Sequence, residues 1–338
     1  MENNLSELSS NYGASEKDSA ISEGKSVMKT ETWMSSLPSS LQNLPLTELT
    51  IPGTHNSGTF SCCTTLAPDA DSAIKKLTEI PIMGCFIESV IHRWAQCQRL
   101  TFTQQLLSGV RYFDLRVSTK PDSDEFFLVH TLYATKVSQL IEDVKSFLDS
   151  YSQEVVILDF NHFYAMEEEH HVQLITYLIA EFGNKICHNC DIADLTLSTL
   201  WGKGHQVIIF YQHKAVESFE EIWPKQRIYN FWPNTDNPET CIARLDTFFN
   251  AKDPHPDIKD FIVCQGVLTP TATTVTQSVF GTGGLETLSE KLLPGFSAWI
   301  EKSLEFTHPL NIVTVDFAEN RGFILKVIDL NYERISCK

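Results

Sequence analysis

The segment EVVILDFNHFY, residues 154–164, combines an almost continuous apolar run with a sudden change to polar side chains. Val, Ile, Leu and Phe fill most of residues 154–160, which is typical of a strand buried on both faces. Asp159, Asn161 and His162 stand where that run ends. Buried strands of this kind occur in parallel sheets covered by helices, so the segment predicts an α/β fold.

Seven further short apolar runs resemble this strand. They are residues 46–51, 110–117, 126–132, 206–212, 228–232, 261–268 and 311–318, of which 228–232 is the weakest. Between several of them, apolar side chains recur every three or four positions, as they do in amphipathic helices. This helical pattern covers residues 137–151, 170–183 and 322–334.

Eight strands over about 280 residues fit a βα barrel, whose usual size is about 250 residues. A doubly wound open sheet is the alternative fold. The gap between the runs 110–117 and 126–132 is too short for a full helix, so we expect the barrel to be irregular there.

Composition limits the possible partners. The chain has 338 residues, of which 42% are hydrophobic, and a formal net charge of −17. Such an acidic chain argues against nucleic acid as a partner, because binding phosphates requires clustered Lys and Arg. Residues 1–31 are polar and Ser-rich, which predicts a disordered tail before a single domain over residues 32–338.

The sequence also predicts the cellular compartment of the protein. We expect no signal peptide, because the first residues lack a basic start and an apolar stretch. The sequence contains no run of 18 apolar residues, so we expect no transmembrane helix. The nine scattered cysteines then indicate reduced thiols and a cytoplasmic protein.

Two short motifs invite functional interpretation. CHNC, residues 187–190, has the spacing of a zinc ligand pair, but no second pair follows at the usual distance, which favours a structural loop. GTGGLE, residues 281–286, lacks the Gly-Lys-Ser/Thr ending of a phosphate-binding loop and is interpreted as a flexible connection.

Functional residues of a βα barrel gather at the carboxyl ends of its strands. The polar residues there are His55, Asn56, Asp114, Arg116, His130, Asp159, Asn161, His162, Tyr211, Gln265, Asp316 and Glu319. Asp114 and Arg116 are two positions apart, so both side chains face the same way, into the barrel. The pattern fits a buried structural ion pair and a functional pair equally well.

Two histidines with an arginine between them suit phosphodiester chemistry. A neutral imidazole at His55 or His130 can accept a proton from an attacking hydroxyl, and the other, as imidazolium, can donate one to the leaving oxygen. Arg116 can neutralise charge on the phosphoryl oxygens. The remaining histidines are interpreted as surface or packing residues: His92, His170, His171, His205, His213, His255 and His308.

Four motifs, in order along the chain, resemble the X-domain-containing proteins of the phosphatidylinositol-specific phospholipase C superfamily. They are WMSSLPSSLQNLPLTELTIPGTHNSGTF (33–60), FTQQLLSGVRYFDLRVSTK (102–120), EVVILDFNHFY (154–164) and LNIVTVDFAENRGFILKVIDLN (310–331). The resemblance implies a distorted TIM barrel. It also implies cleavage of an inositol phospholipid at a membrane surface, with the inositol 2-hydroxyl as internal nucleophile, releasing diacylglycerol and a cyclic inositol phosphate.

Matching the motifs residue by residue implies specific roles. His55 resembles the general base, His130 the general acid and Asp316 the aspartate that orients the base. Arg116 resembles the arginine that contacts phosphate in bacterial-type enzymes, and Asp114 its supporting carboxylate. The weaker candidates, as substrate contacts, are Asn56, Asn161, Tyr211 and Gln265.

Two positions mix the patterns of different family members. The calcium-dependent members share the His55–Asn56 pair but carry an acidic residue where Arg116 stands here. Calcium prefers several oxygen ligands, so we expect no metal and no cofactor. Bacterial-type enzymes usually have aspartate directly after the histidine, so Asn56 predicts reduced activity.

Three functions therefore stay open. The first is a calcium-independent inositol-phospholipid phosphodiesterase. The second is a catalytically weak or inactive head-group-binding protein on the same barrel. The third is a metal-dependent glycerophosphodiesterase, which needs a metal cluster that Arg116 argues against. Residues 89–99, SVIHRWAQCQR, could contact a membrane, although an ordinary amphipathic helix is the better explanation.

Overall fold

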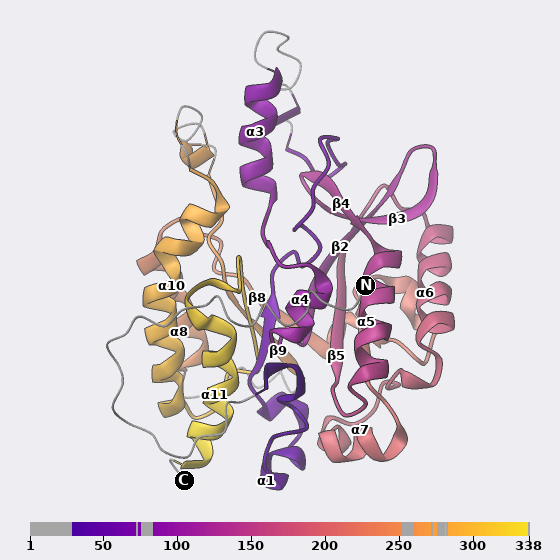
Figure 1. The fold of residues 1–338 in the computed structure, drawn as a ribbon, viewed down its shortest axis with the longest axis vertical. Coiled ribbons are helices and arrows are strands. Elements are labelled where there is room, and N and C mark those ends of the chain that lie inside the picture. Colours follow the sequence, from indigo (N-terminus) through magenta and orange to yellow (C-terminus); the bar gives the residue numbers. More distant parts are fainter. Residues whose placement is uncertain are drawn as a thin grey trace, which may run out of the picture.

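The computed structural model describes residues 29–71, 74–75, 84–251, 260–271, 273–275, 281 and 283–336. Eight parallel strands form a nearly closed barrel that helices surround, as the sequence predicts (Figure 1). Residues 1–28 of the expected tail and His255 lie outside the described residues. Among the described residues no helix is both long and apolar enough to cross a membrane.

The barrel strands follow the order β7-β6-β5-β2-β1-β10-β9-β8. Their bounds are β1 Ile51–Thr54, β2 Tyr112–Lys120, β5 Val156–Tyr164, β6 Val207–Tyr211, β7 Trp223–Pro224, β8 Ile228–Phe231, β9 Phe261–Gly266 and β10 Ile312–Val315. The order begins at β7 and ends at β8, and the short 3-10 helix Lys225–Arg227 joins these two strands. The ring of strands is therefore almost complete.

Helices cover the outside of the barrel and extend beyond its ends (Figure 1). They are α1 Ser39–Gln42, α3 Gly84–Ala95, α4 Phe102–Leu107, α5 Val137–Ser150, α6 Glu168–Phe182, α7 Leu197–Lys203, α8 Pro238–Phe249, α10 Leu285–Lys302 and α11 Phe323–Ser336. Besides Lys225–Arg227, short 3-10 helices lie at Thr30–Thr32, Leu46–Glu48, Gly183–Lys185, Ile192–Asp194, Lys214–Ser218, Ser303–Glu305 and Asn320–Gly322. The three helices expected from apolar periodicity are α5, α6 and α11.

The expected irregularity after β2 is a hairpin. β3, Ser123–His130, pairs antiparallel with β2, and β4, Leu132–Lys136, pairs antiparallel with β3. The expectation that residues 126–132 form a barrel strand is therefore wrong, because an antiparallel return needs only a tight turn and no covering helix. The eighth barrel strand is instead the short β7, which the sequence reading missed.

The first barrel strand, β1, begins at Ile51, the residue at which the predicted strand 46–51 ends. Residues Leu46–Glu48 form a 3-10 helix after Pro45, and β1 includes Pro52. Ile51 and His55 donate their N–H groups to β10 and its flanking residues, whereas Pro52 only accepts a hydrogen bond, from Arg111 N–H. A proline without an N–H is therefore tolerated at this position.

A buried ion pair ties the start of the described chain to the barrel. The guanidinium of Arg111 donates from Nε and one NH2 group to Glu154 Oε2, at 3.0 and 2.8 Å. Glu154 also accepts hydrogen bonds from the N–H groups of Met34 and Ser35. Both charged side chains are buried, so the pair and its hydrogen bonds hold residues 34–35 against the barrel.

The outer face of β6 packs on α6 through aromatic rings. His171 Nδ1 lies 2.8 Å from the Tyr211 hydroxyl, and the His171 ring stacks on His213 with ring centroids 3.6 Å apart. Burial, together with the nearby His213, lowers the pKa of His171 to about 4. The stacked rings confirm a packing role for these two histidines.

We expect Glu154→Gln to destabilise the fold by about 3–5 kcal/mol, because it leaves the buried Arg111 charge uncompensated. Denaturant unfolding measures this change. The matched control is Glu125→Gln, which removes the exposed partner of Lys136 and should cost no more than about 1 kcal/mol. Equal losses in the two variants would contradict the structural role of the buried pair.

The depressed pKa of His171 predicts a stability loss in acid. In the unfolded chain a histidine titrates near its usual pKa of 6.5, so the unfolded state binds more protons between that pH and about 4. Stability should therefore fall as the pH drops through this window, and His171→Gln should flatten the dependence. Urea midpoints measured from pH 7.5 to 4.5 test this, with exposed His308→Gln as control. Parallel curves for the wild type and His171→Gln would contradict the lowered pKa of His171.

Candidate active site

The first element of the site is a histidine held by a carboxylate. His55 follows β1 and Asp316 follows β10, and His55 Nδ1 lies 2.7 Å from Asp316 Oδ1. Gln98 Nε2 donates to the carbonyl oxygens of His55 and Val315, at 2.9 Å each, which fixes the two strand ends together. Burial alone would lower the pKa of His55, but the charge of Asp316 and the hydrogen bond to it raise that pKa to about 9.

Asp114 anchors the turn after His55. Its Oδ2 accepts a hydrogen bond from the backbone N–H of Asn56 at 3.0 Å, and its own N–H donates to Ser57 Oγ. Asn56 has a positive φ of 43°, which asparagine tolerates better than most residues. Burial would raise the pKa of Asp114, but the charges of His55 and Arg116 and a hydrogen bond from Asn161 lower it. The carboxyl is therefore ionised.

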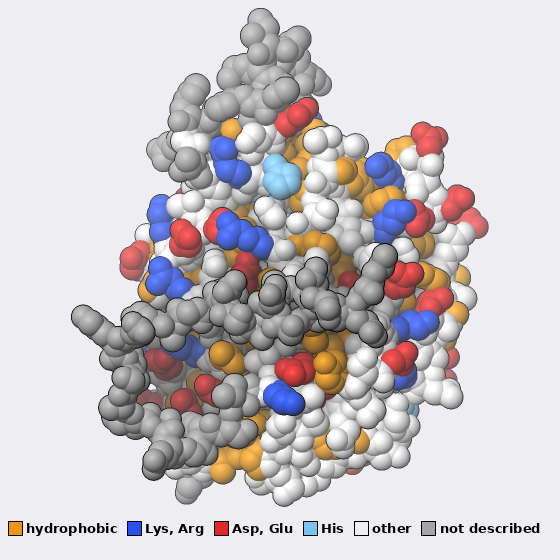
Figure 2. Space-filling view, in the orientation of Figure 1, with side chains coloured by type: hydrophobic (Ala, Val, Ile, Leu, Met, Phe, Trp, Pro, Cys, Tyr) orange, Lys and Arg blue, Asp and Glu red, His pale blue; other side chains and the backbone are white. Residues whose placement is uncertain are grey.

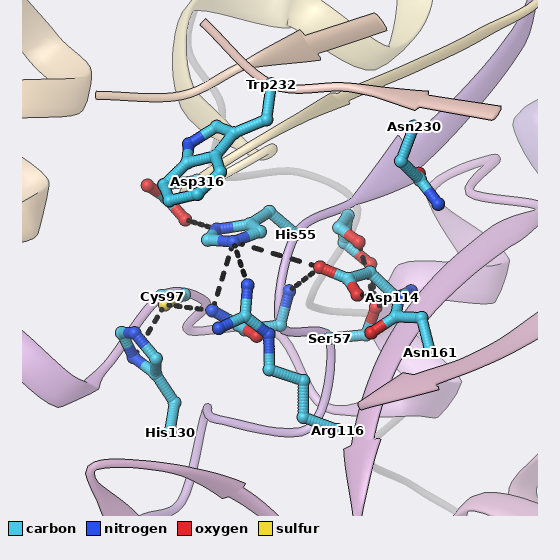
Figure 3. A network of polar contacts seen from close by, with 12 residues as sticks. His55, Ser57, Cys97, Asp114, Arg116, His130, Asn161, Asn230, Trp232 and Asp316 are labelled. Atoms are coloured by element: carbon cyan, nitrogen blue, oxygen red, sulfur yellow. Dashed lines mark hydrogen bonds and ion pairs between the residues drawn. The ribbon is translucent and has the colours of Figure 1, made fainter. Parts of the chain in front are cut away.

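Two donors converge on the other nitrogen of His55. Arg116 NH2 lies 3.3 Å and Asn56 Nδ2 3.1 Å from His55 Nε2 (Figure 3). In the tautomer with its proton on Nδ1 toward Asp316, the Nε2 lone pair faces both of these donors. Asp114 and Arg116 do share one face of β2, as the two-residue spacing predicts.

His130 lies across the site at the end of β3. Its Nδ1 lies 2.9 Å from the carbonyl oxygen of Ala95 and 3.4 Å from Cys97 Sγ. The ring centroids of His55 and His130 are 6.3 Å apart. Burial and the nearby Arg116 charge lower the pKa of His130. The surroundings therefore raise the pKa of His55 and lower the pKa of His130.

Asn161 reaches the site from β5. A register irregularity between β2 and β5 pairs Leu115 with Phe160 but Arg116 with His162, so Asn161 stands in a β-bulge. Its Nδ2 donates to Asp114 Oδ1. The neutral amide therefore supports the Asp114 carboxylate.

A second buried carboxylate, Asp159, lies on β5 two residues before Asn161. Asp159 accepts hydrogen bonds from the Tyr112 hydroxyl at 2.7 Å, from Gln212 Nε2 at 2.8 Å and from Asn230 Nδ2 at 3.3 Å. Burial raises the pKa of Asp159 to about 6. The donors come from β2, β8 and the residue after β6, so this carboxylate joins one side of the barrel to the other.

Two of the expected substrate contacts lie apart from the cluster. Tyr211 is fully buried and its hydroxyl meets His171 on α6, outside the barrel, so the expectation of a substrate contact there is corrected. Strand alternation explains the error, because Phe210 faces inward and Tyr211 faces outward. Gln265 shares the register position of Thr314, two strands from His55. It is half-buried and belongs to the barrel wall.

The sequence reading missed Cys97. This residue follows α3, and its buried thiol lies 3.4 Å from both Asn56 Nδ2 and His130 Nδ1. No strand pattern points to it, since it belongs to a connection whose course depends on the whole fold. Figure 3 shows the thiol between the two histidines.

The described residues hold few groups that could bind a metal. Their one group of three close ligand atoms is His55, Cys97 and Asp316. A calcium ion prefers several oxygen ligands, and this set offers one carboxylate beside a thiol and an imidazole. The donor set therefore does not fit a calcium centre.

Comparison with a family model and with curated proteins gives consistent matches. Residues 90–226 match the family described as phosphatidylinositol-specific phospholipase C, X domain. PI-PLC X domain-containing protein 3 of Mus musculus is 37% identical over 317 residues, which cover 93% of this chain and 97% of that protein. PI-PLC X domain-containing protein 2 of Homo sapiens is 40% identical over 253 residues, covering 74% of this chain and 81% of that protein.

Solved structures share the fold at low sequence identity. A phosphatidylinositol-specific phospholipase C from Staphylococcus aureus has a TM-score of 0.64 and 18% identity, with 90% of this chain and 98% of that chain covered. The enzyme from Listeria monocytogenes has a TM-score of 0.62 and 16% identity, with 90% and 99% covered. Both support the distorted TIM barrel.

Proposed function

Since the chain belongs to the phosphatidylinositol-specific phospholipase C X domain family, we propose that it is a phosphodiesterase that cleaves inositol phospholipids without calcium. The observation that carries this proposal is the His55 cluster. An imidazole held by Asp316 faces a guanidinium and a second imidazole within one site. A base, an acid and a group that neutralises phosphoryl oxygens are the three parts that this cleavage needs.

In the proposed first step, His55 Nε2 takes the proton of the inositol 2-hydroxyl as that oxygen attacks phosphorus. Asp316 stabilises the imidazolium that forms. Arg116 neutralises the phosphoryl oxygens, and Asp114 keeps that guanidinium in place. The bond from phosphorus to the glycerol oxygen breaks, and His130 supplies a proton to that oxygen. The products are diacylglycerol and a cyclic inositol phosphate, which water can open in a second step.

The pKa values of His55 and His130 shift in opposite directions, and this affects their roles as base and acid. With a pKa of about 9, His55 is mostly protonated at neutral pH without substrate and must lose that proton before it acts as the base, whereas the lowered pKa of His130 leaves His130 mostly neutral. The Arg116 charge contributes to that lowering. A bound phosphodiester anion would pair with Arg116 and so favour the protonated acid. Substrate binding would thus prepare the donor.

The second candidate is a head-group-binding protein with weak or no turnover. It is favoured by Asn56, whose amide occupies the Nε2 face of His55 and provides no negative charge for Arg116. Such a protein would keep the pocket and bind inositol phosphates. Turnover assays distinguish the two candidates.

A peripheral membrane encounter, from the cytoplasmic side, belongs to the same proposal. On the face shown in Figure 2, basic and acidic side chains are interspersed rather than separated into one basic surface. α3, which contains most of residues 89–99, projects from the barrel end that follows β1 (Figure 1). The net charge of −17 makes a purely electrostatic attachment to anionic lipid unfavourable.

We expect purified protein to release diacylglycerol and cyclic inositol phosphate from labelled phosphatidylinositol vesicles, with undiminished rate after chelation. His55→Ala should lower kcat by about 10²–10⁴-fold, because it removes the base. Exposed His308→Ala is the matched control. Loss of activity on chelation would contradict the calcium-independent proposal. A wild type without product that still binds inositol phosphate would establish the second candidate.

We expect Asn56→Asp to raise kcat about tenfold, which corresponds to about 1.4 kcal/mol of activation free energy. The new carboxylate would attract Arg116 and release the Nε2 face of His55. Asn43→Asp, the same change at an exposed residue, is the control. Steady-state rates on the same vesicles measure the effect, and an unchanged or lower kcat would remove Asn56 as the cause of weak turnover.

A further inference from the structure

Cys97 has no part in the proposed reaction, yet it lies at the centre of the site. Its side chain is fully buried, and ligand atoms of His55, Cys97 and Asp316 all lie within 4.8 Å of one another. A thiol, an imidazole and a carboxylate are three groups that zinc accepts as ligands. They come from three separate segments, so this grouping depends on the fold.

The spacing of neighbouring donors also suits a small tetrahedral ion. With Zn–S near 2.3 Å and Zn–N near 2.0–2.1 Å, two tetrahedral ligand atoms lie about 3.6 Å apart. Cys97 Sγ and His130 Nδ1 are 3.4 Å apart. His130 can therefore complete the coordination once its Nδ1 leaves the Ala95 carbonyl oxygen.

A second observation is a buried acceptor without a partner beside these groups. The side-chain oxygen of Asn56 is buried without a hydrogen-bond partner, although the residue is only 2% exposed. The nitrogen of the same amide lies 3.1 Å from His55 Nε2 and 3.4 Å from Cys97 Sγ. Rotating the amide would present that oxygen to the space between the imidazole and the thiol, where a cation could use it.

We propose that His55, Cys97 and Asp316 bind a zinc ion, which inhibits the protein by occupying its base. A soft thiolate beside an imidazole selects zinc over calcium or magnesium. Binding forms zinc–sulfur and zinc–nitrogen bonds and releases the Cys97 thiol proton and the proton of the coordinating His55 nitrogen to solvent. The thiolate and the Asp316 carboxylate together balance the two positive charges of the ion.

The inhibitory consequence rests on the proposed function, whereas the binding itself does not. Zinc between His55 Nδ1 and Asp316 would take the carboxylate that orients the ring, and its charge would weaken the Nε2 lone pair as a proton acceptor. The bound ion would also place charge next to Arg116, which must then move away from His55. The zinc-bound protein would have a weakened base and a displaced phosphate-binding group.

Cobalt titration tests the site without any activity. Metal-free, reduced full-length protein is titrated with Co²⁺, and the thiolate-to-cobalt charge-transfer band in the near ultraviolet is recorded. We expect one such band in the wild type, its loss in Cys97→Ser, and its displacement by Zn²⁺. Cys187→Ser, in the CHNC loop, is the matched control and should keep the band. Far-ultraviolet circular dichroism checks that each variant is folded.

Affinity and inhibition supply independent outcomes. Competition with Zn²⁺ should show at least about a 10–100-fold loss of affinity in Cys97→Ser and in His55→Gln. Zinc should also suppress diacylglycerol release, with recovery on chelation. No band, or a band that survives in Cys97→Ser and disappears in Cys187→Ser, overturns the proposal. A cobalt band in a protein without turnover would refute the enzyme function and leave the metal site standing.

Discussion

The parallel pairing of β1 with β10 is the constraint on which the site depends. The register joins Ile51 to Ile312 and Thr54 to Val315, so the residues that follow, His55 and Asp316, come together at the barrel mouth. A slip of one residue would turn the side chains of β1 to the other face of the sheet. Gln98 reinforces this register, because one amide group bonds the backbone on both strands. The base and its orienting carboxylate are therefore positioned by the closure of the barrel, although 261 residues separate them.

The electrostatics of the site follow from that placement. Asp316 on one side of the His55 ring raises its basicity, while Arg116 and Asn56 on the other side present donors to Nε2. Asp316 therefore stabilises the protonated ring, whereas the Arg116 charge disfavours a proton on Nε2. The nearby positive charges of His55 and Arg116 in turn favour the ionised form of Asp114. In the proposed reaction, a phosphate that attracts Arg116 would at the same time free the lone pair of the base.

The sequence predicted the parts of this site that local periodicity controls. Alternation placed Asp114 and Arg116 on one face, and the apolar runs located seven of the eight barrel strands, with the boundary of β1 misplaced. The same alternation, applied carefully to 206–212, would have turned Tyr211 away from the barrel. The place of Cys97 in the site could not be predicted from the sequence, because it depends on how the connection after α3 packs against the turn at His55. The two-residue strand β7 was missed for a similar reason, since its pairing with β6 is set by the closing barrel.

His130 reaches the site from a hairpin that pairs with barrel strand β2. It ends β3 of an antiparallel hairpin, and Thr131, with a positive φ of 65°, starts the turn that leads into β4. The Ala95 carbonyl oxygen and Cys97 then fix the imidazole from the connection after α3. Two structural units thus supply the two histidines: the closed barrel holds the first, and the hairpin with the α3 connection holds the second. The distance between the rings therefore depends on the pairing of β3 with β2 and on the connection after α3, and Cys97 lies where these two parts meet.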